Sequence, residues 1–478
     1  MRIKPFGTLL GSLALVHVGA AAQAGSWDLT PRVSVSQTYT DNVNLAPRSE
    51  DKESDSVSQL NTGFSLQRSG GRTDLSLGYN LQSLAYWEDD GRNTVYHQFA
   101  GTSTTTLIRE TLFLDASASY GQQLRDSRDG FAGDNISTGA RSDVARYSLS
   151  PYWRQGFGSF ATGELRYTWD KVDYQSGGIT SNNSENQRIQ ATLDSGPRFT
   201  TVGWALSYSW DKSAYDDGTD VTLESLEALV RLNISPQFSV YAAGGDERNR
   251  YNRAAEAADP DDTFWRAGFT WLPGPRTSLD AFYGERFFDD TYGLTFSHRF
   301  RHATWQVNYS ESLASLNRVE FVPFLIVDGQ TGLPVVDDDG FPIFFLFPEL
   351  VPDAYISKRL NISVSGQRSK LSWGLAAARE ERLYQTDRGD QEINSFSANL
   401  GWRVAPRTQA TLSSQWQRSD YDLDNRKDDL WNVGLGLSRT LGANTSAAIE
   451  YRYQERDSNQ DDFDYQENRI TATLSRTF

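Results

Sequence analysis

The sequence predicts an all-β protein: a transmembrane antiparallel up-and-down β-barrel of about 22 strands, within a range of about 18 to 24. Three observations carry this prediction. Apolar and polar residues alternate with period two in long segments, the connections between segments are alternately short and long, and the chain opens with an export signal.

The alternation is clear from Leu60 to Leu66, where every second residue is apolar or threonine and those between are polar or glycine. It recurs in Leu112–Tyr120 and Trp265–Trp271. These runs last roughly 10 to 14 residues, the length that a tilted strand needs to cross a bilayer. Strands of soluble sandwiches usually have only about five or six residues. One segment, Val221–Asn233, taken alone also fits an amphipathic helix.

The connections alternate in length. Short ones such as Ser69–Arg72, Gly156–Ser159 and Pro273–Arg276 are followed by long acidic ones such as 41–56 and 125–141. Short periplasmic turns and long external loops are typical of outer-membrane barrels.

The strand count has an independent check. The pattern Tyr-x-Trp-Asp-Lys-x-x-Tyr occurs at Tyr167 and again at Tyr208, and 208 − 167 = 41 residues. If this pitch is two strands with their connections, the 478 − 24 = 454 residues of the mature chain make about 22 strands. We expect the first to start near Trp27 and the last to end at Phe478, with both termini on the periplasmic side.

Residues 1–24 (MRIKPFGTLLGSLALVHVGAAAQA) have the organisation of a secretory signal peptide, with cleavage expected before Gly25. We therefore expect one barrel domain over 25–478, in the outer membrane of a Gram-negative bacterium. Without Arg2 and Lys4 the mature chain has a formal charge of 44 − 62 = −18, which argues against nucleic acid as a partner. The absence of cysteine excludes disulfides and thiolate metal sites.

Aromatic residues close the apolar rows of several predicted strands, and we predict that they form a girdle at the outer membrane interface. Lys171, Lys212 and Arg418 continue these rows at the height of lipopolysaccharide phosphates. The simpler interpretation of these cations is that they snorkel without ligand specificity. The predicted girdle consists of Tyr167, Trp169, Tyr208, Trp210 and Trp416.

The opposite face of the predicted strands carries charges of both signs, which would line the lumen and set a preference for ions or sugars. The simpler interpretation is that these residues are polar because the wall of a water-filled lumen must be polar, without any substrate preference. The predicted lining residues are Asp115, Glu164, Arg166, Arg188, Asp194, Arg231, Arg266, Asp280, Arg286 and Arg299.

The sequence predicts no catalytic, cofactor or metal site, and hence no enzyme. His97, His298 and His302 have no cysteine or acidic pair at ligand spacing. A lipid-facing hydrolase built on His298 is the alternative, but no serine motif supports it.

Residues 316–358 form the most unusual segment, a long apolar loop with FVPFLIVDGQ (321–330) and GFPIFFLFPELVP (340–352). We expect one of three positions for it: in the lumen as a constriction, against a partner or neighbouring barrel, or on the membrane rim. The constriction is favoured because a lumen of this width is not filled by its own side chains and no plug of roughly a hundred residues precedes the first predicted strand. Two turn units, 327–335 and 336–343, indicate a small hairpin, and Asp337–Asp339 lack a full calcium loop. The loop phenylalanines are Phe321, Phe324, Phe341, Phe344, Phe345 and Phe347.

The two ends of the mature chain resemble known signals. The last segment, NRITATLSRTF, ends in Phe478 and resembles the terminal aromatic signal read by the barrel assembly machinery, although Arg476 departs from the usual pattern. The stretch TPRVSVSQTYTDNVNLAP (30–47) resembles the opening of an outer-membrane β-barrel family associated with exosortase/PEP-CTERM systems and exopolysaccharide gene clusters.

This resemblance implies a role in surface polysaccharide export or envelope organisation, as a passage or accessory channel. The implied partners are outer-membrane lipid and lipopolysaccharide, the assembly machinery, polysaccharide and components of an export system. Two alternatives stay open: a general diffusion porin for small solutes, and a structural or adhesive surface protein with a closed lumen.

Overall fold

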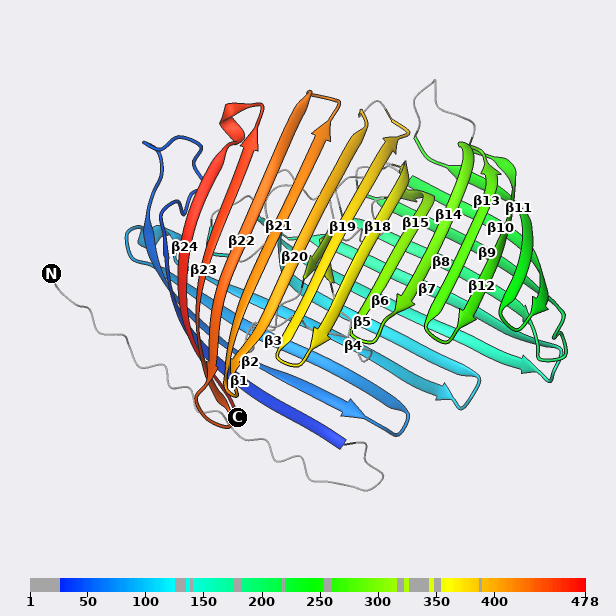
Figure 1. The fold of residues 1–478 in the computed structure, drawn as a ribbon, viewed down its shortest axis with the longest axis horizontal. Coiled ribbons are helices and arrows are strands. Elements are labelled where there is room, and N and C mark those ends of the chain that lie inside the picture. Colours follow the sequence, from blue (N-terminus) through cyan, green and yellow to red (C-terminus); the bar gives the residue numbers. More distant parts are fainter. Residues whose placement is uncertain are drawn as a thin grey trace.

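The chain forms a closed barrel of 22 antiparallel strands, which confirms the predicted fold class (Figure 1). Each strand is hydrogen-bonded to its neighbours in the chain, and the last strand returns to pair with the first. The computed structural model describes residues 26–124, 135–137, 141–175, 183–216, 218, 220–252, 260–315, 322–325, 344–347, 354–386 and 389–478. The predicted signal peptide therefore lies outside the described residues.

The barrel strands are β1 (Ser26–Thr40), β2 (Asp55–Ser69), β3 (Thr73–Tyr86), β4 (Thr94–Ile108), β5 (Leu112–Leu124), β6 (Arg141–Phe157), β7 (Ala161–Tyr174), β8 (Ser184–Ser195), β9 (Val202–Tyr215), β10 (Asp220–Ser235), β11 (Phe238–Arg250), β12 (Asp262–Gly274), β13 (Thr277–Arg286), β14 (Asp289–Arg299), β15 (Ala303–Ser315), β18 (Ala354–Arg368), β19 (Leu371–Tyr384), β20 (Gln391–Ala405), β21 (Thr408–Tyr421), β22 (Arg426–Thr440), β23 (Thr445–Ser458) and β24 (Tyr465–Thr477). Two short 3-10 turns, η1 (Asp90–Arg92) and η4 (Asp461–Phe463), lie in connections. In the part of the chain that the structure describes, no helix is long and apolar enough to cross a membrane.

The two rims of the barrel differ. At the terminal rim, where β1 begins and β24 ends, the connections have 2 to 6 residues, as in 236–237 and 196–201. At the opposite rim, here the loop rim, the connections reach 38 residues between β15 and β18 (316–353), although β13 and β14 are joined there by only two. In the β2–β3 turn, Gly70 and Gly71 have φ of 103° and 75°, a conformation that favours glycine.

Side chains alternate between the two faces of the wall. In β10, Leu226, Val230 and Leu232 are 46%, 54% and 42% exposed on one face, and Glu227 and Arg231 lie on the other. The strand is thus a barrel strand and not the amphipathic helix that Val221–Asn233 alone also fits.

The polar face is the inner one. Residues 135–137, from the β5–β6 connection, bond to Gln82 of β3 and to Glu467 of β24, which are separated by β1 and β2. Because one short segment reaches polar side chains of non-adjacent strands, it lies on the concave side of the wall. The exposed apolar face therefore points outward, as in barrels that contact lipid.

Closure depends on the seam between β1 and β24. Backbone pairing runs from Arg32 opposite Thr477 to Thr40 opposite Arg469. Inner hydroxyls add two bonds across the seam, Ser36 to Thr473 and Thr38 to Thr471, both 2.9 Å.

The segment just after β1 extends this seam beyond the strands. Asp41 accepts hydrogen bonds from the backbone and side-chain nitrogens of Asn468, at 2.7 and 2.8 Å. The fully buried Asn42 donates from Nδ2 to the carbonyls of Ala46 (3.0 Å) and Gln466 (2.9 Å), and its Oδ1 accepts from Ala46 N–H at 2.9 Å. These residues lie in the stretch 30–47, on which the predicted family resemblance rests. In this fold their hydrogen bonds connect the end of the first strand to the last strand.

The chain terminus lies at the same seam. The N–H of Phe478 donates to the carbonyl of Pro31 at 2.9 Å, and its ring is 61% exposed. The guanidinium of Arg476 lies 4.9 Å from the ring centroid. The role of Phe478 as an assembly signal stays a prediction.

A second, two-stranded sheet comes from the apolar loop. β16 (Val322–Leu325) pairs antiparallel with β17 (Phe344–Phe347), and the barrel strands are not part of this sheet. Figure 1 shows it within the outline of the barrel, below the loop rim. Phe321, Phe341 and both turn units (327–343) lie outside the described residues, as do the side chains of Phe324, Phe344, Phe345 and Phe347.

Replacing Asn42 by alanine should lower the free energy of unfolding by about 2 to 4 kcal/mol, since each lost hydrogen bond of a buried group contributes about 1 kcal/mol. Urea unfolding in lipid vesicles, followed by tryptophan fluorescence, measures the change. The control is Asn44→Ala in the same loop, where Asn44 makes only exposed bonds to Asp51 and Glu53. Equal effects of the two substitutions would show that Asn42 does not hold the seam.

Candidate functional site

The candidate site is the inner wall of the barrel. All ten predicted lining residues lie on the inward face. Side chains alternate along each strand, and each of the ten stands at an inward position of its strand in the observed register. They do not converge on one point. Seven of them form clusters or ion pairs around the lumen with partners from other strands.

One cluster centres on Arg166 of β7. Its guanidinium contacts Asp115 at 2.8 Å and Glu164 at 3.2 Å, and lies 3.8 Å from the ring centroid of Tyr152. Arg154 binds the other oxygen of Glu164 at 2.6 Å. Two arginines, two carboxylates and an aromatic face are thus held together on the inner wall of β5–β7.

A second cluster lies on β10–β13. Arg266 makes a two-pronged contact with Glu227, at 2.7 and 3.0 Å. Beside it, Tyr241 donates to one oxygen of Asp280 at 2.9 Å and Thr270 donates to the other at 2.6 Å. Such forked contacts fix both partners in orientation as well as in position.

Two further predicted arginines have carboxylate partners, Arg188 on the adjacent strand β9 and Arg286 on β11, which is separated from β13 by β12. Arg188 binds Asp211 at 2.6 Å, and Arg286 binds Glu247 through two contacts of 2.8 Å. The other three predicted residues, Asp194, Arg231 and Arg299, make no ion pair with a described residue. The guanidinium of Arg231 lies 5.9 Å from the ring centroid of Tyr241.

Several charged pairs nearer the loop rim were not predicted from the sequence, and these are the most buried ion pairs among the described residues. The sequence does contain a pattern that could have predicted them, because an arginine and a carboxylate two residues apart on a strand lie on the same face. Members at 380/382, 426/428 and 467/469 follow this spacing and pair at 3.2, 2.6 and 2.7 Å. The residues are Glu380, Arg382, Arg426, Asp428, Glu467 and Arg469.

The lumen is packed at the loop rim and wider below it. Near the terminal rim, inward residues such as Asp28, Gln67 and Arg299 are exposed. Towards the loop rim, inward residues become buried on strands all around the barrel. Examples are Thr40, Val144, Tyr215, Glu247, Arg382 and Asp428.

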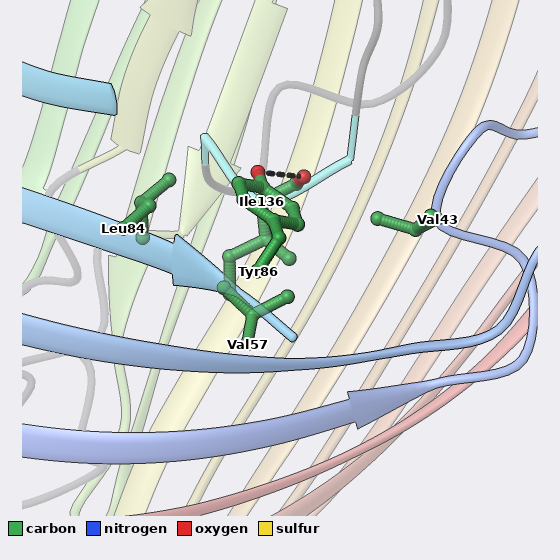
Figure 2. Close-up of a cluster of buried hydrophobic side chains, with 5 residues drawn as sticks. All are labelled: Val43, Val57, Leu84, Tyr86 and Ile136. Carbon is green, nitrogen blue, oxygen red and sulfur yellow. Dashed lines mark hydrogen bonds between the residues drawn. The ribbon is translucent and has the colours of Figure 1, made fainter. Parts of the chain in front are cut away.

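Part of this packing is an apolar cluster inside the loop rim (Figure 2). Ile136 of the β5–β6 connection packs with Val43, Val57, Leu84 and Tyr86, and all five are at most 5% exposed. The hydroxyl of Tyr86 donates to the carbonyl of Ile136 at 2.6 Å. A loop residue is thus held against the inner wall.

Polar contacts hold the residues beside Ile136. Asn135 donates to Gln82 at 2.7 Å. Ser137 bonds to both Glu467 and Arg469, and Thr40 donates to the same Glu467 oxygen at 2.5 Å. This buried network joins the loop to the seam between β1 and β24.

The predicted girdle residues lie on the outward face. Trp169, Trp210 and Trp416 each stand eight residues after the first residue of a 14-residue strand (161 to 169, 202 to 210 and 408 to 416). The polar tips of two girdle residues reach carboxylates: Tyr208 to Glu224 at 3.0 Å and Trp416 to Asp429 at 3.1 Å.

The cations next to these tryptophans are paired as well. Lys171 lies 3.1 Å from Asp173, and Lys212 lies 3.1 Å from Asp220. Arg418 contacts Asp420 at 3.5 Å and Asp429 at 3.7 Å.

Among the described residues, no group of histidine and acidic side chains is arranged to hold a metal ion. His97 bonds to the hydroxyl of Tyr79 at 2.8 Å, and His298 to that of Thr277 at 2.7 Å. Asp337–Asp339 lie outside the described residues.

No model of a protein family matches the chain, and no curated protein sequence matches it. Solved structures match the fold. A mutant of the ferric enterobactin receptor PfeA from Pseudomonas aeruginosa has a TM-score of 0.52 at 11% identity, covering 96% of this chain and 81% of that one. The siderophore receptor PirA from Acinetobacter baumannii has a TM-score of 0.51 at 9% identity, covering 94% and 80%. At these identities the likeness shows the fold, that of outer-membrane β-barrels, and nothing of the ligand.

If the three tryptophans mark one membrane height, nitroxides placed there should report one depth. We expect the spin-labelled variants Trp169→Cys, Trp210→Cys and Trp416→Cys to show similar depths by power-saturation electron paramagnetic resonance, because indole rings prefer the interface. Each label is unique, since the protein has no cysteine. Thr168→Cys, on the inward face, is the control. A tryptophan site with the water accessibility of Thr168 would contradict the outward placement.

Asp428→Asn should destabilise the barrel by about 3 to 5 kcal/mol, because it removes the carboxylate partner of a buried arginine. The side chains of Arg426 and Asp428 are only 3% and 1% exposed. The matched control is Glu450→Gln, which breaks the same type of pair with Arg452, whose members are 44% and 25% exposed. There the loss should be below about 1 kcal/mol. Urea unfolding measures both, and similar losses would contradict the role of burial.

Proposed function

We propose that this protein is an outer-membrane barrel that serves as a passage or accessory channel for surface polysaccharide. The observation that carries the proposal is the chemistry of the inner wall. It combines hydroxyls, arginine–carboxylate pairs and tyrosine faces in a lumen that is wider at the terminal rim than at the loop rim. Sugars are recognised by such hydrogen-bonding groups and by aromatic faces.

One part of the wall has the size and lining for sugar units. A concavity of about 450 Å³ lies on the inner face of β2–β6. Its inward residues include hydroxyl side chains and two carboxylates, and Asp115 connects it to the Arg166 cluster. The lining includes Ser76, Thr102, Thr104, Ser117, Ser148, Asp74 and Asp115.

The orientation follows from the rims. Outer-membrane barrels have short periplasmic turns and longer external loops, so we place the terminal rim on the periplasmic side. A polymer would then enter the wider end of the lumen and leave past the packed loop rim. We propose that the apolar segment 316–358, which connects β15 to β18 at the loop rim, narrows the passage there.

The resemblance of residues 30–47 supports the same role, although Asp41 and Asn42 act in closing the barrel. The partners of the proposed channel are outer-membrane lipid, lipopolysaccharide, the assembly machinery and an export system. The role requires no catalytic step.

Removal of the gene should leave the polymer in the periplasm and strip most of it from the cell surface. Fractionated polymer from the mutant strain measures this. The wild-type gene should restore export, and Ser117→Trp, which fills the concavity, should restore it poorly. Ala118→Val, at the next and outward position, should act like wild type. Unchanged surface polymer in the mutant strain would overturn the proposal. Conductance in planar bilayers would then separate a diffusion porin from a closed structural barrel.

A further inference from the structure

One side of the lumen carries no charge over the middle of the barrel. Its strands are β15 and β18–β22, which are consecutive neighbours in the sheet (Figure 1). Along their middle parts, the inward positions hold only asparagine, glutamine, serine, threonine, glycine and alanine. This surface, here the neutral wall, consists of the inward residues of 304–312, 361–367, 372–378, 395–401, 409–417 and 432–438.

The charged inward residues of these strands stand beyond the ends of the neutral wall. Arg359, Arg382 and Arg426 lie towards the loop rim and are paired with carboxylates. Arg403 lies at the terminal rim. Elsewhere around the lumen, β5–β13 carry the charged clusters described above. One side of the lumen is thus charged at mid-height and another is not.

The amide side chains of the neutral wall are available for hydrogen bonds. Inward amides elsewhere are paired: Asn61 donates to Ser34 at 3.2 Å, and Asn80 donates to Gln98 at 3.0 Å. By contrast, six amides of the neutral wall make no side-chain hydrogen bond with a described residue, and all six are exposed or half-buried. They are Gln306, Asn308, Asn361, Asn399, Gln415 and Asn432.

The strand register arranges these groups in rows across the sheet. In a second such row Asn399 stands opposite Ser413, and its amide lies over Gly374, where an added Cβ would meet Asn399 Oδ1 at 2.7 Å. Adjacent strands lie about 4.8 Å apart, so a row presents several amides and hydroxyls to one extended ligand. The first row, of successive Cα partners from β15 to β22, consists of Gln306, Ser363, Ala376, Ser397, Gln415 and Asn432.

The chemistry of the neutral wall selects one kind of ligand. An amide has N–H donors and a carbonyl acceptor, and a hydroxyl both donates and accepts. The hydroxyls of a sugar also do both, so they match every polar group of this wall. A carboxylate or phosphate only accepts and is bound best by cationic donors, whereas an ammonium group only donates and is bound best by carboxylates. The neutral wall has neither, so it fits an uncharged chain rich in hydroxyls.

We propose that the neutral wall is a contact surface for the exported polymer and that this polymer is a neutral glycan, without uronate, phosphate or amino groups. The inference rests on the proposed passage of polysaccharide and names the class of its substrate. The neutral wall is a second surface beside the concavity on β2–β6. Across the lumen, most of the predicted charged residues are held in ion pairs and do not attract a charged polymer.

Nitroxide labels locate the sugar inside the barrel. One label is placed on Ser413→Cys, an inward and exposed position of the neutral wall. The matched control is Ser207→Cys on β9, which is also inward and five residues after the start of a 14-residue strand (202 to 207, as 408 to 413). Nine barrel strands separate β9 from β21 in one direction and eleven in the other, so the two labels lie on opposite sides of the lumen. Each is unique, because the protein has no cysteine.

The probe is maltohexaose, a neutral hexasaccharide, added to the folded barrel in micelles of a zwitterionic detergent. Broadening of its proton magnetic resonance signals should be severalfold greater with the label at 413 than at 207. The hexamer of galacturonic acid has a carboxylate on each sugar and should be broadened severalfold less than maltohexaose by the label at 413. High salt screens the net negative charge of the protein in both measurements.

Equal broadening of maltohexaose from the two positions, or none from either, would overturn the neutral wall as the contact surface. Equal broadening of the two sugars at 413 would overturn the neutral class of the polymer.

The amides have a test of their own. Gln415→Leu combined with Asn432→Leu removes two hydrogen-bonding side chains at similar size, and it should reduce the broadening of maltohexaose at 413 severalfold. The control is Gln190→Leu, which replaces an exposed inward amide of β8 on the charged side and should change nothing. Heat-modifiable migration shows that each variant has folded. Unchanged broadening in the double variant would overturn the role of the amides.

Failure of this inference differs from failure of the proposed passage. Loss of surface polymer from the strain without the gene, together with equal broadening at 413 and 207, would overturn the neutral wall and leave the passage. Unchanged surface polymer in that strain would overturn the passage, and with it the exported polymer as the ligand of this wall.

Discussion

The pairing of β1 with β24 is the constraint on which the rest of the structure depends. In a membrane, every backbone N–H and C=O needs a partner within the protein, and only a closed sheet supplies one on both sides of each strand. Closure fixes which side chains face in, because alternation then holds around the whole circle. The bonds of Asp41 and Asn42 to Asn468 and Gln466 extend this seam above the strands.

The alternation made the fold and the two faces predictable from sequence. β10 is the instructive case: its helical reading fails because Leu226 and Val230 contact the outside while Glu227 and Arg231 face the lumen. What local pattern could not predict is partner choice. Arg266 and Glu227 are 39 residues apart, and Arg166 and Asp115 are 51 apart. Those distances reflect the register between strands, which forms only when the sheet is assembled.

Loops were harder to predict than strands for a related reason. Ile136 stands in a polar, glycine-containing connection, and nothing in its neighbours marks it as a core residue. Its burial depends on Leu84 and Tyr86 of β3 and Val43 of another loop, which come together only inside the closed wall. The constriction was predicted from the apolar composition of segment 316–358. The described packing at the loop rim also involves a shorter and more polar segment, residues 135–137.

Strand pairing is incomplete at the β14–β15 seam. Strand length alone does not explain the interruption, since both edges continue by at least five residues beyond the last pair and still do not bond to each other. The edges therefore diverge. In hydrocarbon their unpaired backbone groups would each cost several kcal/mol, but at the level of Tyr292 and Tyr309 water and lipid head groups can satisfy them. Pairing between β4 and β5 likewise ends at an outward aromatic pair, Phe99 opposite Tyr120, so both interruptions stand where water and head groups replace the missing backbone partners.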